Sequence, residues 1–151
     1  MQRSQSETPL SDLIDDYVGW YTHKSFVRFL QAFREARVGV GAIGIPPSTI
    51  GDFQASSEHP ISVGSSEDDQ GNRVVLVCAD PHAFAQRFGL RFNAEMQGRS
   101  VLETVLHDPE CAGIRVNSAI REVSIIIDRE NTKRLLAPSR SAYQRPWWRL
   151  W

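Results

Sequence analysis

The clearest helical pattern lies in residues 22–36. Apolar side chains recur there at intervals of three and four: Phe26, Phe29, Leu30 and Phe33. The other face is filled by polar residues, which predicts a helix with one apolar face: Lys24, Arg28, Gln31, Arg34 and Glu35. The preceding segment has a weaker repeat of the same kind. There, Ser11 or Asp12 can cap a helix that begins near Leu13.

The pattern changes to strand-like alternation over residues 38–45, although glycines interrupt it. Residues 46–72 are rich in Ser, Gly, Pro and acids. A structureless loop of about 25 residues is unusual in a compact domain, so we expect either a short strand near residues 60–64 or genuine mobility of the segment. Residues 73–79 form a nearly continuous apolar run, which is typical of a central strand covered on both faces.

Asp80 and Pro81 directly follow this run. Aspartate is a good N-cap, and proline is a good first helical residue. We therefore expect a helix over residues 81–88, capped by the side chain of Asp80 and ended by Gly89.

The remaining chain alternates between the two patterns. Strands are predicted at 90–95, 114–117 and 122–127, and helices at 98–106 and 128–136, the last capped by Asp128. Because helices and strands intermix, the predicted fold class is α/β (α+β): a single domain with a mixed sheet of about five strands and flanking helices. We assign this domain to residues 11–138, with a disordered N-terminus (1–10) and a C-terminal tail (139–151).

The charge is uneven along the chain. Residues 1–70 hold 5 Lys/Arg and 10 Asp/Glu, a net charge of −5, whereas residues 71–151 hold 12 Lys/Arg and 8 Asp/Glu, a net charge of +4. The total of −1 makes nucleic-acid binding by the whole chain unlikely. No apolar run approaches the length of a membrane helix, and the first residues lack a signal-peptide core. Only two cysteines are present, which fits a cytoplasmic protein.

Chemistry-bearing residues are sparse. The histidines and cysteines do not form the paired spacings of zinc sites, so we expect no metal. A glycine motif at residues 39–44 lies within a predicted strand and not before a helix, so we expect no nucleotide cofactor either. Cys78, His82 and Asp80 lie close together and could serve a small hydrolase or transferase. However, Cys78 ends a very apolar strand, where cysteines are usually inert.

The tail is the most distinctive segment. Aromatic and cationic side chains alternate near its end: Arg145, Trp147, Trp148, Arg149 and Trp151. Trp and Arg are enriched in protein interfaces, so the tail could bind a protein partner or mediate self-association. Alternatively, the rings could fold back over the domain itself. A second candidate surface is the acidic run Glu67, Asp68 and Asp69, which could steer a basic partner.

The order of these segments resembles the SseB-like N-terminal domain, a small bacterial α/β module. The resemblance spans about residues 22–137. It rests on the Phe26-x-x-Phe29-Leu30-x-x-Phe33 helix, the glycine-bearing strand at 38–45, the Val74 to Val77 strand leading to Asp80 and Phe84, the run from Gly113 to Ser118, and the closing segment from Glu122-Val123 through Asp128 to Leu135-Leu136. The resemblance implies a binding or regulatory module of secretion-related and stress contexts, with no agreed catalytic set.

Two hypotheses follow for the function. The first is a non-enzymatic bacterial protein-binding module, of which one concrete form is an immunity-type partner that neutralises a toxin. The second is the small hydrolase or transferase that uses Cys78, His82 and Asp80.

Overall fold

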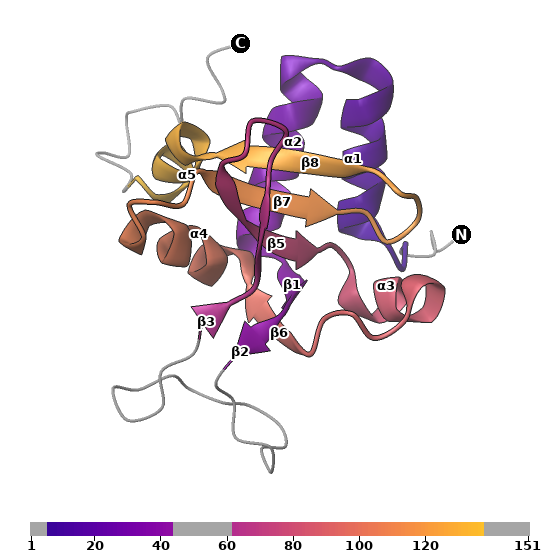
Figure 1. The fold of residues 1–151 in the computed structure, drawn as a ribbon. Coiled ribbons are helices and arrows are strands. Elements are labelled where there is room, and N and C mark those ends of the chain that lie inside the picture. The colour runs from indigo at the N-terminus through magenta and orange to yellow at the C-terminus, as the bar shows by residue number, and fades with distance from the viewer. Residues whose placement is uncertain (1–5, 44–61, 138–151) are drawn as a thin grey trace.

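The computed structural model describes residues 6–43 and 62–137 of the chain (Figure 1). Its helices are α1 (Pro9–Trp20), α2 (His23–Glu35), α3 (Pro81–Phe88), α4 (Gly98–His107) and α5 (Arg129–Leu136). Its strands are β1 (Arg37–Val40), β2 (Ala42–Ile43), β3 (Ser62–Val63), β4 (Ser65–Glu67), β5 (Arg73–Cys78), β6 (Ala94–Gln97), β7 (Gly113–Asn117) and β8 (Ser124–Asp128).

Six of these strands form one mixed sheet. Its order is β6-β1-β5-β7-β8, and β4 also pairs with β5. The β5–β7 pair is parallel, and the other pairs are antiparallel. β1 and β4 pair with successive halves of β5, while β2 and β3 form a separate small pair. This arrangement confirms the predicted α/β class and mixed sheet.

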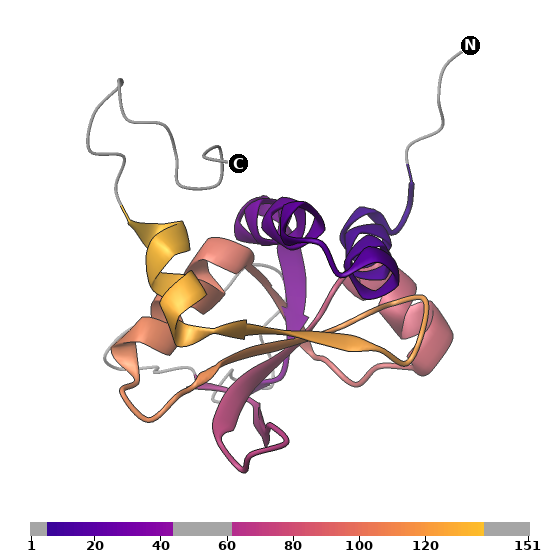
Figure 2. The same ribbon diagram turned by 90° about the horizontal axis from the view of Figure 1, so that it is seen from above.

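One face of the sheet carries the main hydrophobic core. Alternate strand residues point into this core, among them Val77, Val116 and Ile127, and all three are fully buried. α1, α2, α4 and α5 contribute the opposing side chains. Figure 2 shows α1 and α2 lying along this side of the sheet. The opposite face carries a row of directly paired residues, Leu76, Arg115 and Ile126, none of which is fully buried.

Most predicted elements are present, with shifted ends. The helix at 22–36 is α2, and the Thr22 side chain accepts the N–H of Ser25 as its cap. The 38–45 strand divides into β1 and β2 at Gly41, and β3 lies within the predicted 60–64 segment. The 90–95 strand is displaced to β6, and the last strand begins at Ser124.

The first helix begins earlier than predicted. α1 starts at Pro9, and Leu10 is buried, so residues 9 and 10 belong to the domain and not to a disordered N-terminus. Proline is pre-organised for the first turn of a helix, which explains this start. The cap of this helix comes from a distant part of the chain.

Asp80 caps α1, although the sequence predicted that it would cap α3. One carboxylate oxygen of Asp80 accepts the N–H of Ser11 at 2.7 Å, and the other accepts the N–H of Leu10 at 3.4 Å. Asp80 itself has a left-handed backbone (φ 47°, ψ 66°) and makes no side-chain cap to α3. Aspartate tolerates this conformation better than most residues. The carboxylate therefore joins the start of α1 to the end of β5.

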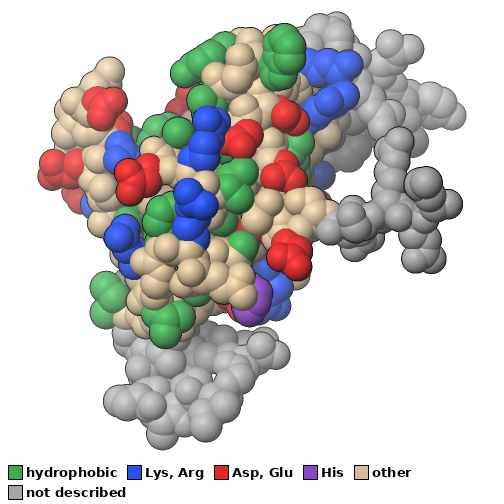
Figure 3. Space-filling view, turned by 90° about the vertical axis from the view of Figure 1, so that its right-hand side faces the viewer, with side chains coloured by type: hydrophobic (Ala, Val, Ile, Leu, Met, Phe, Trp, Pro, Cys, Tyr) green, Lys and Arg blue, Asp and Glu red, His purple; other side chains and the backbone are tan. Residues whose placement is uncertain are grey.

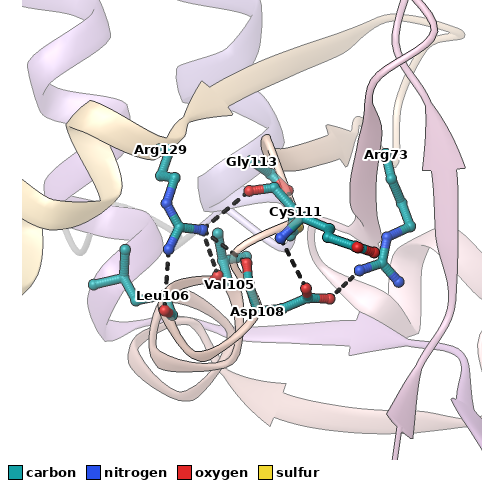
Figure 4. Close-up of polar contacts among 8 residues, drawn as sticks. Arg73, Val105, Leu106, Asp108, Cys111, Gly113 and Arg129 are labelled. Carbon is teal, nitrogen blue, oxygen red and sulfur yellow. Dashed lines mark hydrogen bonds and ion pairs between the residues drawn. The ribbon is translucent and has the colours of Figure 1, made fainter.

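The amino ends of β5 and β7 are closed by polar contacts (Figure 4). The Arg129 guanidinium donates hydrogen bonds of 2.9–3.1 Å to four main-chain carbonyl oxygens, those of Val105, Leu106, Asp108 and Cys111. Carbonyls at the end of a helix have no partner within the helix, and a cationic side chain can satisfy them. Arg73 forms an ion pair with Asp108 beside this cluster. These contacts hold α4 and α5 against the start of β7.

Candidate binding groove

A groove lies at the carboxyl ends of the same parallel strands. It is formed by α3, the chain after α3, the end of β7 and the β7–β8 connection. In open α/β sheets, ligands bind outside the carboxyl ends of the parallel strands, because the chain leaves the sheet there and opens a crevice. The groove is therefore in the part of this fold where binding sites are expected.

Two adjoining hollows of about 250 and 260 Å³ make up the groove. Both are lined by Phe84, Arg91 and Asn117. The first extends over Phe88 and the β7–β8 connection, and the second extends over Leu76 toward the start of β4. Arg91 and Asn117 thus lie where the hollows meet.

Aromatic rings form one wall of the groove. The ring centroid of Phe84 lies 4.9 Å from that of Phe88 and 5.3 Å from that of Phe92. Such tilted and edge-on pairs are favourable ring geometries. Phe84 is buried, whereas Phe88 and Phe92 are half-buried and present apolar surface to the hollows.

Several polar side chains that line the groove have no partner in the described part of the chain, among them Arg91, Asn117 and the carboxylate of Glu122. Among the described residues, neither the Arg91 guanidinium nor the Asn117 side-chain amide makes a hydrogen bond or ion pair. Arg121, on the rim, is already held by Asp15 through contacts of 2.7 and 2.8 Å. Arg87 lies over the Phe88 ring at 5.6 Å. Figure 3 shows arginine and hydrophobic side chains together in the middle of this face.

This combination fits a ligand with an anionic group beside an apolar one. A guanidinium binds a carboxylate through parallel N–H donors, and an amide can add both a donor and an acceptor. The phenylalanine wall can cover an apolar side chain of the same ligand. Because the two hollows adjoin at Phe84, Arg91 and Asn117, a ligand that fills both would be an extended segment.

The three residues of the enzyme hypothesis have separate environments. Cys78 is 1% exposed and packs with Phe84 and Ala119. Burial raises the pKa of its thiol from 9.0 to about 12. The Asp80 carboxylate is bound to α1, and His82 Nε2 lies 3.4 Å from Gln86 Nε2. A buried thiol that stays protonated at neutral pH is unlike a nucleophilic cysteine.

The acidic run of the sequence lies at the β4–β5 turn. The Asp68 carboxylate accepts the N–H of Asn72 at 2.8 Å and that of Gln70 at 2.9 Å. These bonds, led by the one from Asn72, lower the pKa of Asp68. Asp68 therefore closes the turn, and Glu67 and Asp69 flank it at the surface. None of the three acids lines the groove. The predicted tail residues, Arg145, Trp147, Trp148, Arg149 and Trp151, lie outside the described residues.

The groove residues were not predicted from the sequence. Phe84 and Phe88 stand four apart on α3, and Arg87 and Arg91 share that spacing. This repeat could have indicated a face with both ring and cation chemistry. Asn117, by contrast, gives no sequence signal beyond its position at the end of a strand.

In comparisons with known proteins, no family model, curated protein or solved structure matches the chain. The described residues contain no group of three or more His, Cys, Asp or Glu side chains placed to hold a metal ion. Of the helices described, none has both the length and the apolar character needed to span a membrane.

Proposed function

We propose that the chain is a non-enzymatic bacterial protein-binding module whose groove binds an extended segment of a partner protein. The segment would carry a carboxylate beside an apolar side chain. The observation that carries this proposal is the pair of unpartnered groups, Arg91 and Asn117, beside the phenylalanine wall. The resemblance to SseB-like domains implies the same class of function.

The proposed partner chemistry follows from charge and burial. A guanidinium without an intramolecular partner can donate hydrogen bonds to a carboxylate without first breaking an ion pair. The binding free energy is then not reduced by the loss of an existing contact. The half-buried rings supply the apolar contact that usually provides most of the binding energy. An immunity-type protein that holds an acidic segment of a toxin in the cytoplasm is one concrete form of this function.

The enzyme alternative has less support. Its thiol is buried, its carboxylate is engaged with α1, and its histidine is exposed on α3. We therefore retain binding as the proposed function and assign Cys78 to packing.

A displayed library of random peptides, selected on the immobilised full chain, tests the proposal. We expect enriched peptides to place Asp or Glu next to Phe, Leu or Ile. Arg91→Glu should weaken their binding by at least about tenfold, because it replaces the cation with a negative charge that repels the carboxylate of the peptide. Arg28→Glu is the matched control, since Arg28 is an exposed arginine on α2 and does not line the groove. Enrichment of basic peptides, no enrichment, or equal binding by the Arg91 variant would each contradict the proposal.

A further inference from the structure

A second surface, which meets the groove only at Ser124, is the outer edge of β8. This strand is the last in the sheet, and among the described strands only β7 pairs with it. Figure 2 shows its outer edge toward the viewer, with no described helix or strand across it. Edge strands present unpaired N–H and C=O groups, which can template pairing with another chain.

The hydrogen bonds of β7 identify the residues whose main-chain groups point outward. The Ser118 N–H donates to the Val123 carbonyl at 2.9 Å, and the Asn117 carbonyl accepts from Ala79 on the β5 side. Main-chain groups alternate in direction along an antiparallel strand. The N–H and C=O groups of Ser124, Ile126 and Asp128 therefore point away from β7, and of these the Asp128 carbonyl already accepts the Thr132 hydroxyl at 2.8 Å. In the part of the chain that the structure describes, no other element bonds to Ser124 or Ile126.

β8 lacks the usual protection of an edge strand. Proteins commonly blunt such edges with lysine, proline or a bulge. The sequence from Ser124 to Asp128 contains neither lysine nor proline, its pairing with β7 is continuous, and its central residue, Ile126, is 37% exposed. The opposite edge, β6, differs: it carries Glu95, which lies 4.0 Å from Arg37.

We propose that β8 pairs antiparallel with β8 of a second copy of this chain, about a two-fold axis at Ile126. A two-fold contact places the same surface against itself, so its residues must be self-complementary. In this register Ile126 faces Ile126, and Ser124 faces Asp128 of the other copy. The only charged residue of the strand thus meets a hydroxyl and not a like charge.

The same register extends the exposed face of the sheet. Leu76, Arg115 and Ile126 already form one row across β5, β7 and β8. Pairing at Ile126 joins this row to its copy and covers the exposed isoleucines with each other. Cross-strand pairs of β-branched residues are favourable, and like charges directly opposite are not. The arginines of the two rows remain separated by the isoleucine pair.

Sedimentation of the full chain over a range of concentrations tests this proposal. We expect a reversible dimer whose dissociation constant rises by at least about tenfold in Ile126→Lys. The matched control is Ile43→Lys, because Ile43 is 62% exposed but lies on β2. Ser124→Pro provides a second variant: it removes an outward N–H while leaving the β7 bonds intact, and it should also weaken the dimer.

Cross-linking tests the register. Ile126→Cys should form a disulfide-linked dimer under mild oxidation much faster than Ser124→Cys, because only residue 126 faces itself across the axis. The two native cysteines are buried and should contribute little background. A monomer at all concentrations, a dimer unaffected by both Ile126→Lys and Ser124→Pro, or faster cross-linking at residue 124 would overturn the proposal. Ser124 also lines the groove, whereas Ile126 does not, so the Ile126 variants separate the dimer from the groove.

Discussion

At the amino ends of β5 and β7, Arg129 satisfies four main-chain carbonyls, whereas at the carboxyl ends of the same strands Arg91 has no partner among the described residues. Both arginines are bordered by apolar side chains. They differ in whether their guanidinium N–H groups donate hydrogen bonds to other described residues. The amino end is filled by helix termini, and the carboxyl end is left open as a groove.

From this difference we assign a stabilising role to the amino end and propose binding at the carboxyl end. An arginine that satisfies buried carbonyls contributes to folding, because its removal leaves several acceptors without donors. A cation left unused in a hollow costs little to remove from the folded chain. Mutations at the two ends should therefore separate stability from binding.

The largest effect is expected at Gly113, at the closed amino end. A Cβ added there would lie 2.2 Å from the Ile127 carbonyl oxygen, so β7 and β8 would have to move apart. Gly113→Ala should lower the free energy of unfolding by more than about 3 kcal/mol. Urea denaturation would measure the loss. Gly19→Ala is the control, since open space surrounds Gly19 in α1, and it should be neutral or stabilise by up to about 1 kcal/mol. Equal effects of both changes would contradict the account of the closed end.

Arg129→Ala should have the next largest effect. The loss of hydrogen bonds to four carbonyls should cost about 2–4 kcal/mol of unfolding free energy. Arg73→Ala removes a more exposed ion pair from the same region, and it should cost less than about 1 kcal/mol. Thermal unfolding of both variants would compare them. If Arg73→Ala cost more, the central role given to Arg129 would be wrong.

The titration of Cys78, which is buried beneath the groove, should make the free energy of unfolding depend on pH. Because burial raises the pKa of this thiol to about 12, the folded chain resists its ionisation. Its contribution to stability is complete below pH 9, the ordinary pKa, and is lost as the pH rises toward 12. The free energy of unfolding should fall by about 1.4 kcal/mol per pH unit in this interval. Cys78→Ala should have a shallower slope in the same titration, whereas an unchanged slope would place the titrating group elsewhere.

The smallest effect on stability is expected at Arg91. Since its guanidinium has no partner in the described chain, Arg91→Ala should change the unfolding free energy by less than about 0.5 kcal/mol. Denaturation of this variant beside Arg129→Ala gives the direct contrast between the two ends. A loss comparable to that of Arg129→Ala would show that Arg91 is structural.

Local signals predicted much of the fold. Asp128 caps its own helix, as its sequence position indicated, and the apolar run before Asp80 became the central strand β5. The cap by Asp80 was assigned to the wrong helix because its carboxylate accepts an N–H from α1, that of Ser11, which lies 69 positions earlier in the chain. A sequence pattern cannot distinguish a neighbouring helix end from one that the fold brings close.

The groove could not be predicted for a related reason. Arg91 and Asn117 belong to different segments, and only the parallel pairing of β5 with β7 places these segments near each other. The proposed site also depends on a guanidinium, that of Arg91, without a partner among the described residues. The sequence does not show which arginines have partners in the folded chain. The packing role of Cys78, by contrast, could be predicted, because the apolar strand that it ends already indicated a buried position.

The central claim is that the carboxyl end of the β5–β7 pair is the binding surface. Its most direct test is an NMR titration of the isotopically labelled full chain with a capped peptide of alternating Glu and Phe. The account predicts that amide signals of Phe84, Arg91 and Asn117 shift and saturate, while signals near Arg129 stay in place. It also predicts that Arg91→Glu abolishes the shifts and Arg28→Glu preserves them. Shifts centred on the Arg129 end, or shifts unchanged in Arg91→Glu, would contradict it.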